Sequence, residues 1–577
     1  MRAEIRDRAF RLPSAYALRM NTLCRALAVF AAACTIPAAG YAQSAPLPTL
    51  EPTVVEVDLS TLPSHEKAAL ARIIHAARKL DTLFIRQIWP GTAALLRQRT
   101  PSQTTQVRAE VEALNFFKGP WDNDGKAFIL GAPATRPIAD FYPAAATKDA
   151  LEAWLGTLSP PKRKRALGAF TAIRPGSGGR FEVEPYSRYY ASELRSVAHE
   201  LRAAAALTHE PTLKRYLVTR AQALLDDDYY ASDVAFVGLR GPIDVALGPY
   251  EVDDDNWFGV KTSFQASIAL LNKAASEHVA LIASHLQELE DHLPLAAELR
   301  GRRLAAAAPV VILDAIYQGG LSGAGRAQAG YGLPNDLRVL KAVGARTGTY
   351  SNILELRYHR TFLPIATTAL AAPDRAALRF EDIRDEIMLV RMFDSLGPQL
   401  VTGTKQPIAD ALRENWGVAL QVRSMLLSLW GHRYLIEHGY LDARDAAPMY
   451  AAFLVPALAR LRGGLSSPSS QGSTYVLNRL IDAGAVRANS EEHLTIDAKR
   501  ADAEVVRAAN EFIPAMAKGD ADTVHALLHQ NVMMNPKLQP VFDRMGPAPP
   551  LDRIIYRTAD NLDALDRETR IDNPPQR

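Results

Sequence analysis

The chain has 577 residues, of which 48% are hydrophobic, 22% charged and 7% aromatic. This composition is typical of a globular protein with more than one lobe, and it excludes disordered and collagen-like chains. The formal net charge of +3 originates in residues 1–42, which hold six arginines against Glu4 and Asp7. The remaining chain has 60 basic and 61 acidic side chains, so its net charge is near −1 and it lacks the basic excess of a nucleic-acid-binding protein.

Residues 1–42 have the order of residues that is typical of a secretory signal peptide. Basic residues precede an apolar run from Leu27 to Ile36, and small residues lead to a cleavage site expected after Ala42. The apolar run is too short to span a bilayer. We therefore expect a periplasmic or secreted protein with no stable membrane span, and a lipoprotein acylated at Cys34 is the less favoured alternative. Both cysteines of the chain lie in this segment, so the mature protein has no disulfide.

Helix-type spacing of apolar residues governs most of the remaining chain. In chain order it predicts helices over 64–114, 147–157 and 186–228, then a long helix from 264 to 294, then helices from 378 to about 530. Turn-rich stretches at 115–145 and 241–256 interrupt this pattern. Val310 to Leu313 reads as a buried strand, and the segment from Ala329 to Asn352 is the best candidate for a sheet. The expected fold class is mostly α with a small β region.

Common catalytic motifs are absent from the sequence. It contains no G-x-S-x-G, no phosphate-binding P-loop and no G-x-G-x-x-G. Without cysteine, a metal would need histidine and carboxylate ligands. The pairs His199-Glu200 and His209-Glu210 each lack the second histidine that would complete a two-ligand helix face. Isolated residue chemistry therefore predicts no active site.

Several short segments together resemble the dipeptidyl peptidase III family of zinc metallopeptidases, especially its shorter bacterial branch. The segments occur in family order and are Gly119-Pro120-Trp121-Asp122, Phe141-Tyr142-Pro143, Gly248-Pro249-Tyr250-Glu251, Phe258-Gly259 with Lys261, Leu333-Pro334-Asn335-Asp336, Asn352 with Pro364-Ile365-Ala366, Leu396-Gly397-Pro398, and Leu435-Ile436 with Gly439. The resemblance implies a two-lobed fold around a peptide-binding cleft. It implies a mixed α/β lower lobe formed by residues 43–261 and 308–361, and a helical upper lobe formed by residues 262–307 and 362–577.

The zinc-binding motifs of that family are not preserved in this sequence. The family carries H-E-x-x-H or H-E-x-x-x-H just before the Leu-Gly-Pro segment, and a glutamate on a second helix supplies the third zinc ligand. In this chain the two histidines correspond to Val390 and Asp394, and the general-base glutamate corresponds to Arg391. The third ligand corresponds to Gln421, and a further acid on the same helix corresponds to Met425.

These replacements remove the chemistry of a zinc peptidase. Val390 has no lone pair, Arg391 is a permanent cation where a dication would bind, and Gln421 is a poor neutral ligand. A shift of the alignment does not restore the motif, because no histidine lies between His359 and His432. We expect no catalytic residues, no bound metal and no zinc cofactor. Arg391 and Asp394 have the spacing of an ion pair on a helix, and we expect that pair to occupy the former metal position.

The expected cleft can still bind a peptide through hydrogen bonds between the main chains of the protein and the peptide. In the family, a strand that ends in the Pro-Asn segment binds peptides by strand addition, and Gly330, Tyr331, Gly332 and Asn335 occupy that place here. The alternative for Asn335 is that Pro334-Asn335-Asp336 only turns the chain. Tyr250, Glu251 and Asp255 can likewise be structural corners.

The resulting expectation is an exported, non-catalytic homologue that binds a peptide or protein ligand in its cleft, with no nucleic-acid partner. The alternative is an active hydrolase with an altered metal site. That alternative would need new ligands close to Asp394, such as His359 or His432.

Overall fold

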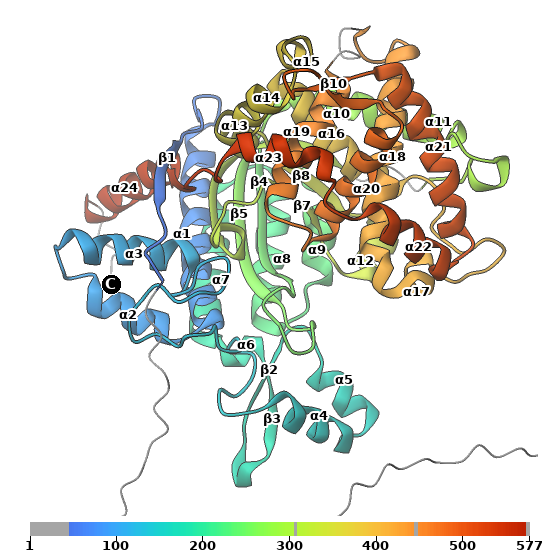
Figure 1. The fold of residues 1–577 in the computed structure, drawn as a ribbon. Helices are drawn as coiled ribbons and strands as arrows, with labels where there is room; N and C mark the ends of the chain where they lie inside the picture. Colours follow the sequence, from blue (N-terminus) through green and yellow to red (C-terminus); the bar gives the residue numbers. More distant parts are fainter. Residues whose placement is uncertain (1–44, 305–308, 444–447, 573–577) are drawn as a thin grey trace, which may run out of the picture.

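The computed structural model describes residues 45–304, 309–443 and 448–572, which form two lobes (Figure 1). Each lobe has its own extensive core of buried apolar side chains. The predicted fold class, mostly α with a small β region in two lobes, is confirmed. The predicted signal peptide, residues 1–42, lies outside the described residues. Within these three ranges, no helix combines the length and the apolar character that a membrane span requires.

A five-stranded sheet forms the centre of the lower lobe, which is built mainly from residues 50–271 and 310–350. In spatial order its strands are β4 (Ile243–Glu251), β5 (Ser263–Leu271), β6 (Val310–Gly320), β8 (Arg346–Tyr350) and β7 (Gly330–Leu333). β6 and β8 run parallel, and the other neighbours are antiparallel. β7 therefore pairs on one side only, and no strand of the described chain covers its other edge.

Helices of the N-terminal half pack around this sheet and form the rest of the lower lobe (Figure 1). The longer ones are α1 (Ser64–Ile88), α3 (Thr105–Phe117), α7 (Ala191–Leu207) and α8 (Pro211–Asp226). The shorter elements are α2 (Gly91–Arg99), α4 (Lys148–Thr157), α5 (Pro160–Ala166), the hairpin of β2 (Thr171–Pro175) and β3 (Phe181–Pro185), α6 (Tyr186–Tyr189), α9 (Tyr230–Val237) and α12 (Leu337–Val343).

The C-terminal segment of the chain returns to the lower lobe. β1 (Leu50–Val55) and β11 (Leu551–Tyr556) pair in parallel, and α24 (Arg557–Asp572) packs against α1. The assignment of all of 262–307 and 362–577 to the upper lobe is therefore wrong in two places. β5 belongs to the lower-lobe sheet, because its main chain pairs with β4 and β6, and residues 551–572 belong with β1 and α1.

The predicted long helix from 264 to 294 is also wrong. The structure has the strand β5, then α10 (Lys273–Ser284), and then α11 (Leu286–Asp291). Phe264, Ala266 and Ile268 alternate with polar residues, so the same segment satisfies a period of two as well as helical steps of three and four. Hydrogen bonds to β4 and β6, which are distant in sequence, decide between the two patterns.

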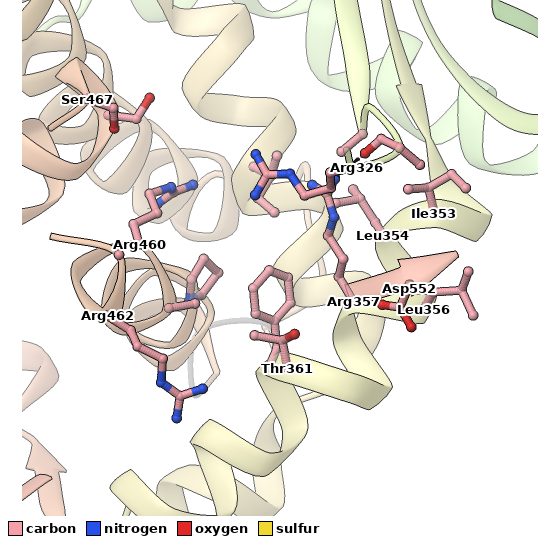
Figure 2. A pocket seen from close by; sticks show the side chains of 18 of the residues that line it. Arg326, Ile353, Leu354, Leu356, Arg357, Thr361, Arg460, Arg462, Ser467 and Asp552 are labelled. Atoms are coloured by element: carbon pink, nitrogen blue, oxygen red, sulfur yellow. Dashed lines mark hydrogen bonds between the residues drawn. The ribbon is translucent and has the colours of Figure 1, made fainter. Parts of the chain in front are cut away.

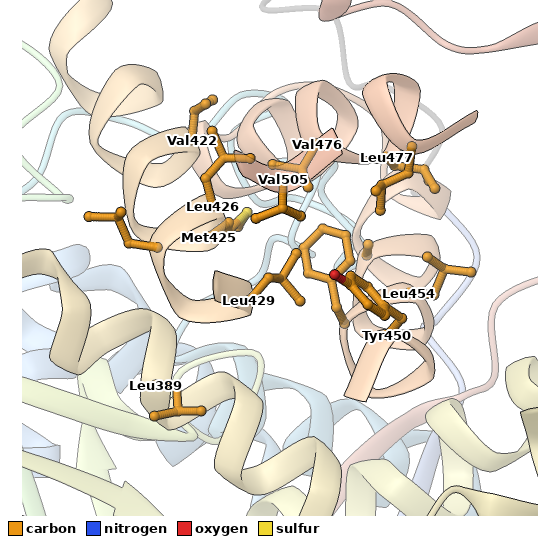
Figure 3. Close-up of a cluster of buried hydrophobic side chains, with 14 of the residues drawn as sticks. Leu389, Val422, Met425, Leu426, Leu429, Tyr450, Leu454, Val476, Leu477 and Val505 are labelled. Atoms are coloured by element: carbon orange, nitrogen blue, oxygen red, sulfur yellow. The ribbon is translucent and has the colours of Figure 1, made fainter. Parts of the chain in front are cut away.

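The upper lobe is a helical assembly around a single apolar core (Figure 3). Its main helices are α16 (Phe380–Met392), α18 (Trp416–Glu437), α19 (Met449–Arg462), α20 (Pro468–Asp482), α21 (Ala498–Ala517) and α22 (Ala521–Asn531). Its smaller elements are α14 (Leu363–Ala369), α15 (Ala372–Ala377), α17 (Ile408–Leu412), α23 (Gln539–Met545) and the two-stranded pair of β9 (Val486–Ala488) and β10 (Leu494–Ile496). The short helix α13 (Ser351–Arg357) packs against β6 and belongs to the lower lobe. Leu426, Leu429 and Val476 in the upper-lobe core are almost fully buried. The helical prediction for 378–530 is confirmed.

Asp255 is a structural corner at the loop between β4 and β5. Its carboxylate accepts hydrogen bonds from the main-chain N–H groups of Phe258 (3.1 Å), Val260 (2.9 Å) and Lys261 (2.9 Å). It also accepts one from the Tyr142 hydroxyl at 2.8 Å. The segments that carry part of the family resemblance, around Tyr142 and Asp255, thus stabilise the lower lobe.

Candidate functional site

A cavity of about 1020 Å³ lies between the two lobes. From the lower lobe it is lined by β7 and β8, and from the upper lobe by α16, α18, α19 and the start of α20. Figure 2 shows Arg326 and Arg357 on one side of this cavity and Arg460, Arg462 and Ser467 on the other. The cavity is the candidate peptide-binding cleft.

All five positions that the sequence resemblance equates with the zinc motifs of the family line this one cavity. Val390 and Arg391 lie near the end of α16, Asp394 lies in the 3₁₀ turn that follows, and Gln421 and Met425 lie on α18. The structure therefore brings together residues that are about 30 positions apart in the sequence. This proximity is what the family resemblance implies.

The side chains at these positions do not fit a zinc ion. Zinc in catalytic sites takes three nitrogen, oxygen or sulfur ligands from the protein. Val390 has no donor atom, and Arg391 carries a fixed positive charge. Gln421 uses its amide oxygen to accept a hydrogen bond from the Ser469 hydroxyl at 3.1 Å. In the part of the chain that the structure describes, no group of three or more His, Cys, Asp or Glu residues is placed to hold a metal ion.

The expected ion pair between Arg391 and Asp394 is not formed. Asp394 instead accepts a hydrogen bond from the Ser424 hydroxyl of α18. Burial raises the pKa of Asp394 above its usual value, and the hydrogen bond from Ser424 opposes this effect. No carboxylate of the described residues lies within 4.0 Å of the Arg391 guanidinium. The sequence spacing of Arg391 and Asp394 allows an ion pair, but Ser424 of α18 binds the Asp394 carboxylate instead.

Neither histidine of the alternative hydrolase lines the cavity. His432 is buried in the upper lobe, with its Nδ1 3.6 Å from Oε2 of Glu386. His359 is exposed and its ring lies against Tyr358. The ligands that this alternative would need close to Asp394 therefore lie elsewhere.

Arg423 connects the two helices that border the former metal position. It is fully buried and donates hydrogen bonds to the carbonyl oxygens of Pro398 (2.7 Å) and Asp394 (2.8 Å). Burial lowers its pKa to about 10. Arg423 thus joins α18 to the Leu396-Gly397-Pro398 segment and is structural.

The free edge of β7 presents main-chain groups. The Tyr350 N–H donates to the Ala329 carbonyl at 2.9 Å, and Gly330 lies opposite Thr349. Because hydrogen-bonded and non-hydrogen-bonded pairs alternate along an antiparallel ladder, Tyr331 bonds to β8. Gly330 and Gly332 then direct their N–H and C=O groups away from β8. Gly332 is exposed and lines the cavity, so unpaired main-chain groups border the cleft.

The other two candidate peptide-binding residues have structural partners. Tyr331 is buried, and its hydroxyl donates to Asp244 of β4 at 2.7 Å. Asn335 follows β7 and donates from its amide to the Tyr250 carbonyl at 3.0 Å and to Glu251 at 3.3 Å. Asn335 does not line the cavity. Its side chain turns the chain after β7 and fastens this turn to the end of β4.

Arginines are the functional candidates that sequence reasoning missed. Arg326, Arg357, Arg460 and Arg462 line the cavity together with Arg391. They come from a loop after β6, from α13 and from α19, and no motif connects them in sequence. Only a three-dimensional arrangement reveals them as a group.

The helical lobe, the mixed lobe and the cavity between them define a two-lobed protein with a cleft. No family model matches the sequence. The structure is similar to dipeptidyl-peptidase III from Corallococcus sp. strain EGB, with 35% identity, 89% of this chain and 97% of that chain covered, and a TM-score of 0.77. It is also similar to the enzyme named DPP III from Caldithrix abyssi, with 25% identity, 89% and 98% coverage and a TM-score of 0.84.

The chain belongs to the dipeptidyl peptidase III family. The resemblance seen in the sequence is thereby confirmed. A curated protein, Nudix hydrolase 3 of Arabidopsis thaliana, is 25% identical over 534 residues, which cover 83% of this chain and 69% of that protein.

Proposed function

We propose that this protein is an exported, non-catalytic member of the dipeptidyl peptidase III family that binds peptides, or a peptide segment of a partner protein, in the cleft between its lobes. The observation that carries the proposal is the side-chain set at the former metal position. Val390, Arg391 and Gln421 stand where a zinc peptidase needs two ligands and a general base. The signal-like order of residues 1–42 supports export to the periplasm or the medium.

The purified protein should contain far less than one zinc per chain after incubation with excess zinc and desalting. Elemental analysis measures the metal, and release of dipeptides from oligopeptide amides measures hydrolysis. We expect neither, because Val390 and Arg391 supply no ligand and no general base. Stoichiometric zinc together with chelator-sensitive dipeptide release would instead establish the alternative, an active hydrolase with an altered site.

Peptide binding is proposed to use the free edge of β7. The outward N–H and C=O groups of Gly330 and Gly332 can continue the sheet with one more strand. Strand addition takes its affinity from the main chain and needs no metal. The edge borders a cavity large enough to receive side chains of the added strand.

Replacing Gly332 by proline should weaken peptide binding by about tenfold or more, because proline removes the outward N–H of an edge strand and leaves the pairing with β8 intact. Gly332→Ala is the matched control. An added Cβ would meet nothing closer than the Thr347 hydroxyl at 3.9 Å, and the N–H remains. Equilibrium dialysis against a degenerate octapeptide pool, with mass spectrometry of the retained peptides, measures the difference. Equal retention by Gly332→Pro and Gly332→Ala would exclude the β7 edge as the binding site.

A further inference from the structure

The cleft contains more positive charge than the surrounding protein neutralises. Its lining includes five arginines, Arg326, Arg357, Arg391, Arg460 and Arg462, but only two carboxylates, Asp394 and Asp552. Asp552 is paired with Arg360, which lies outside the lining, at 2.9 Å. Asp394 bonds to Ser424. Both carboxylates are thus held by other residues.

None of the five arginines forms an ion pair within 4.0 Å among the described residues. Arg357, Arg460 and Arg462 donate to neutral oxygens of Ala327, Ser473 and Met545, respectively. For Arg326 and Arg391 the structure records no hydrogen bond to a described residue. A buried or half-buried guanidinium normally has a carboxylate or a set of carbonyl partners. These groups therefore have donors available for a ligand.

The arginines also affect one another. Burial and the neighbouring cations Arg326 and Arg391 lower the pKa of Arg357 to about 9. Burial lowers the pKa of Arg460 to about 10, and Arg391 contributes to this shift. Arg391 is therefore the central member of the group. An anion bound there would relieve repulsion between several cations at once.

The position of Arg391 relative to β7 indicates which part of a ligand it would meet. A Cβ built on Gly330 would lie 2.8 Å from Nη1 of Arg391, so the guanidinium covers the sheet face to which that Cβ would point. Residues directly opposite each other on paired strands project from the same face of the sheet. A strand added at the β7 edge would therefore direct the side chain opposite Gly330 toward Arg391. The next side chain on that face follows two residues later.

We infer that the cleft selects acidic peptides, in which a carboxylate side chain of a strand added to β7 bonds to the Arg391 guanidinium and alternate acidic residues meet the neighbouring arginines. This inference rests on the proposed function and specifies its ligand. Guanidinium groups bind carboxylates in a planar, two-bond geometry, which makes such contacts selective. Glycine at 330 leaves room for the guanidinium, because a side chain there would collide with the Gly348 carbonyl oxygen and with Arg391.

The test uses the full mature chain and three blocked octapeptides in isothermal titration calorimetry. One peptide alternates Glu and Val, the second alternates Gln and Val, and the third has four Glu followed by four Val. We expect the alternating Glu peptide to bind about tenfold or more tightly than the Gln peptide, because each charge-assisted pair is stronger than a neutral hydrogen bond. The block peptide has the same charge but should bind more weakly, because its acidic side chains fall on both faces of the strand.

Arg391→Met should reduce the preference for the Glu peptide over the Gln peptide to nearly none, and Arg391→Lys should retain part of it. Arg195→Met, at an exposed arginine of α7 outside the cavity, is the matched control and should behave as the parent. Arg391 is half-buried with no hydrogen bond and no ion pair within 4.0 Å among the described residues, and burial outweighs the attraction of Asp394 and lowers its pKa, so Arg391→Met should have a thermal midpoint equal to or above that of the parent. A merely structural arginine would lower the midpoint.

The outcomes separate the inference from the function on which it rests. If the parent binds the Glu and Gln peptides equally and Gly332→Pro binds neither, peptide binding at the β7 edge is supported and the charge selection is overturned. Equal binding of the alternating and block peptides would overturn the face-specific contact. Binding of inorganic phosphate or pyrophosphate at Arg391, without binding of any of the peptides, would overturn both the inference and the proposed function.

Discussion

The combined substitutions Val390→His, Arg391→Glu, Asp394→His and Gln421→Glu should give this protein a site that retains zinc, about one ion per chain. Position 390 lies near the end of α16, position 394 lies in the 3₁₀ turn that follows it, and position 421 lies on α18 across the same cavity. The proposed function implies that these positions keep the backbone on which the family holds three zinc ligands. Elemental analysis of the desalted protein measures the bound zinc, which should rise from far below one ion per chain in the parent to about one ion per chain in the variant.

The control for this experiment is the same protein with Gln421 retained. It has two histidines and the added glutamate but lacks the third ligand, so it should lose zinc on desalting. A folded four-residue variant that still holds no zinc would show that the backbone at α16 and α18 has itself diverged. Our interpretation of Val390, Arg391 and Gln421 as side-chain replacements in a preserved frame would then be wrong.

Replacing Asp244 by alanine should lower the free energy of unfolding by about 3–5 kcal/mol, because it leaves a buried guanidinium without its carboxylate. Asp244 on β4 and Arg346 on β8 are both almost fully buried and form an ion pair at 2.7 Å. The Tyr331 hydroxyl of β7 donates to the same carboxylate. Burial, together with Asp244, raises the pKa of Tyr331 well above its usual value, so the hydroxyl remains a donor. This cluster links the two edge strands of the sheet through side chains.

Urea unfolding followed by circular dichroism checks this prediction. Asp253→Ala is the matched control, because Asp253 is exposed in the loop after β4, and it should change stability by less than about 0.5 kcal/mol. The pair Asp244→Leu with Arg346→Leu should recover most of the loss, since it removes both buried charges. A loss below about 1 kcal/mol in Asp244→Ala would mean that the cluster does not hold β7 in place.

The helical part of the fold was predictable because its signal is local. From 378 to 530 the apolar residues recur at helical steps, and the only described strands there are the short β9 and β10. The segment 263–271 carries both periods, and only pairing with β4 and β6 makes it a strand. The position of residues 551–572 in the lower lobe was not predicted either, because it depends on pairing between β1 and β11 and not on a local sequence pattern.

The candidate site was predictable in part for a related reason. Val390, Arg391, Asp394, Gln421 and Met425 could be located because short family motifs flank them in the sequence. The expected pair of Arg391 and Asp394 was wrong, because helix spacing contains no information on Ser424, which lies on another helix. Arg326, Arg357 and Arg460 carry no motif and could not be grouped without coordinates.

By itself the sequence determined which donor atoms this protein can offer to a metal, because ligand chemistry is a property of the side chains present. It also determined the family and the mostly helical character, because short motifs and helical periods are local. Only the tertiary structure decided which strand forms a free edge and which arginines surround one cavity. Those features depend on contacts between segments that are separated in the sequence, and such contacts produce no periodic pattern of residues.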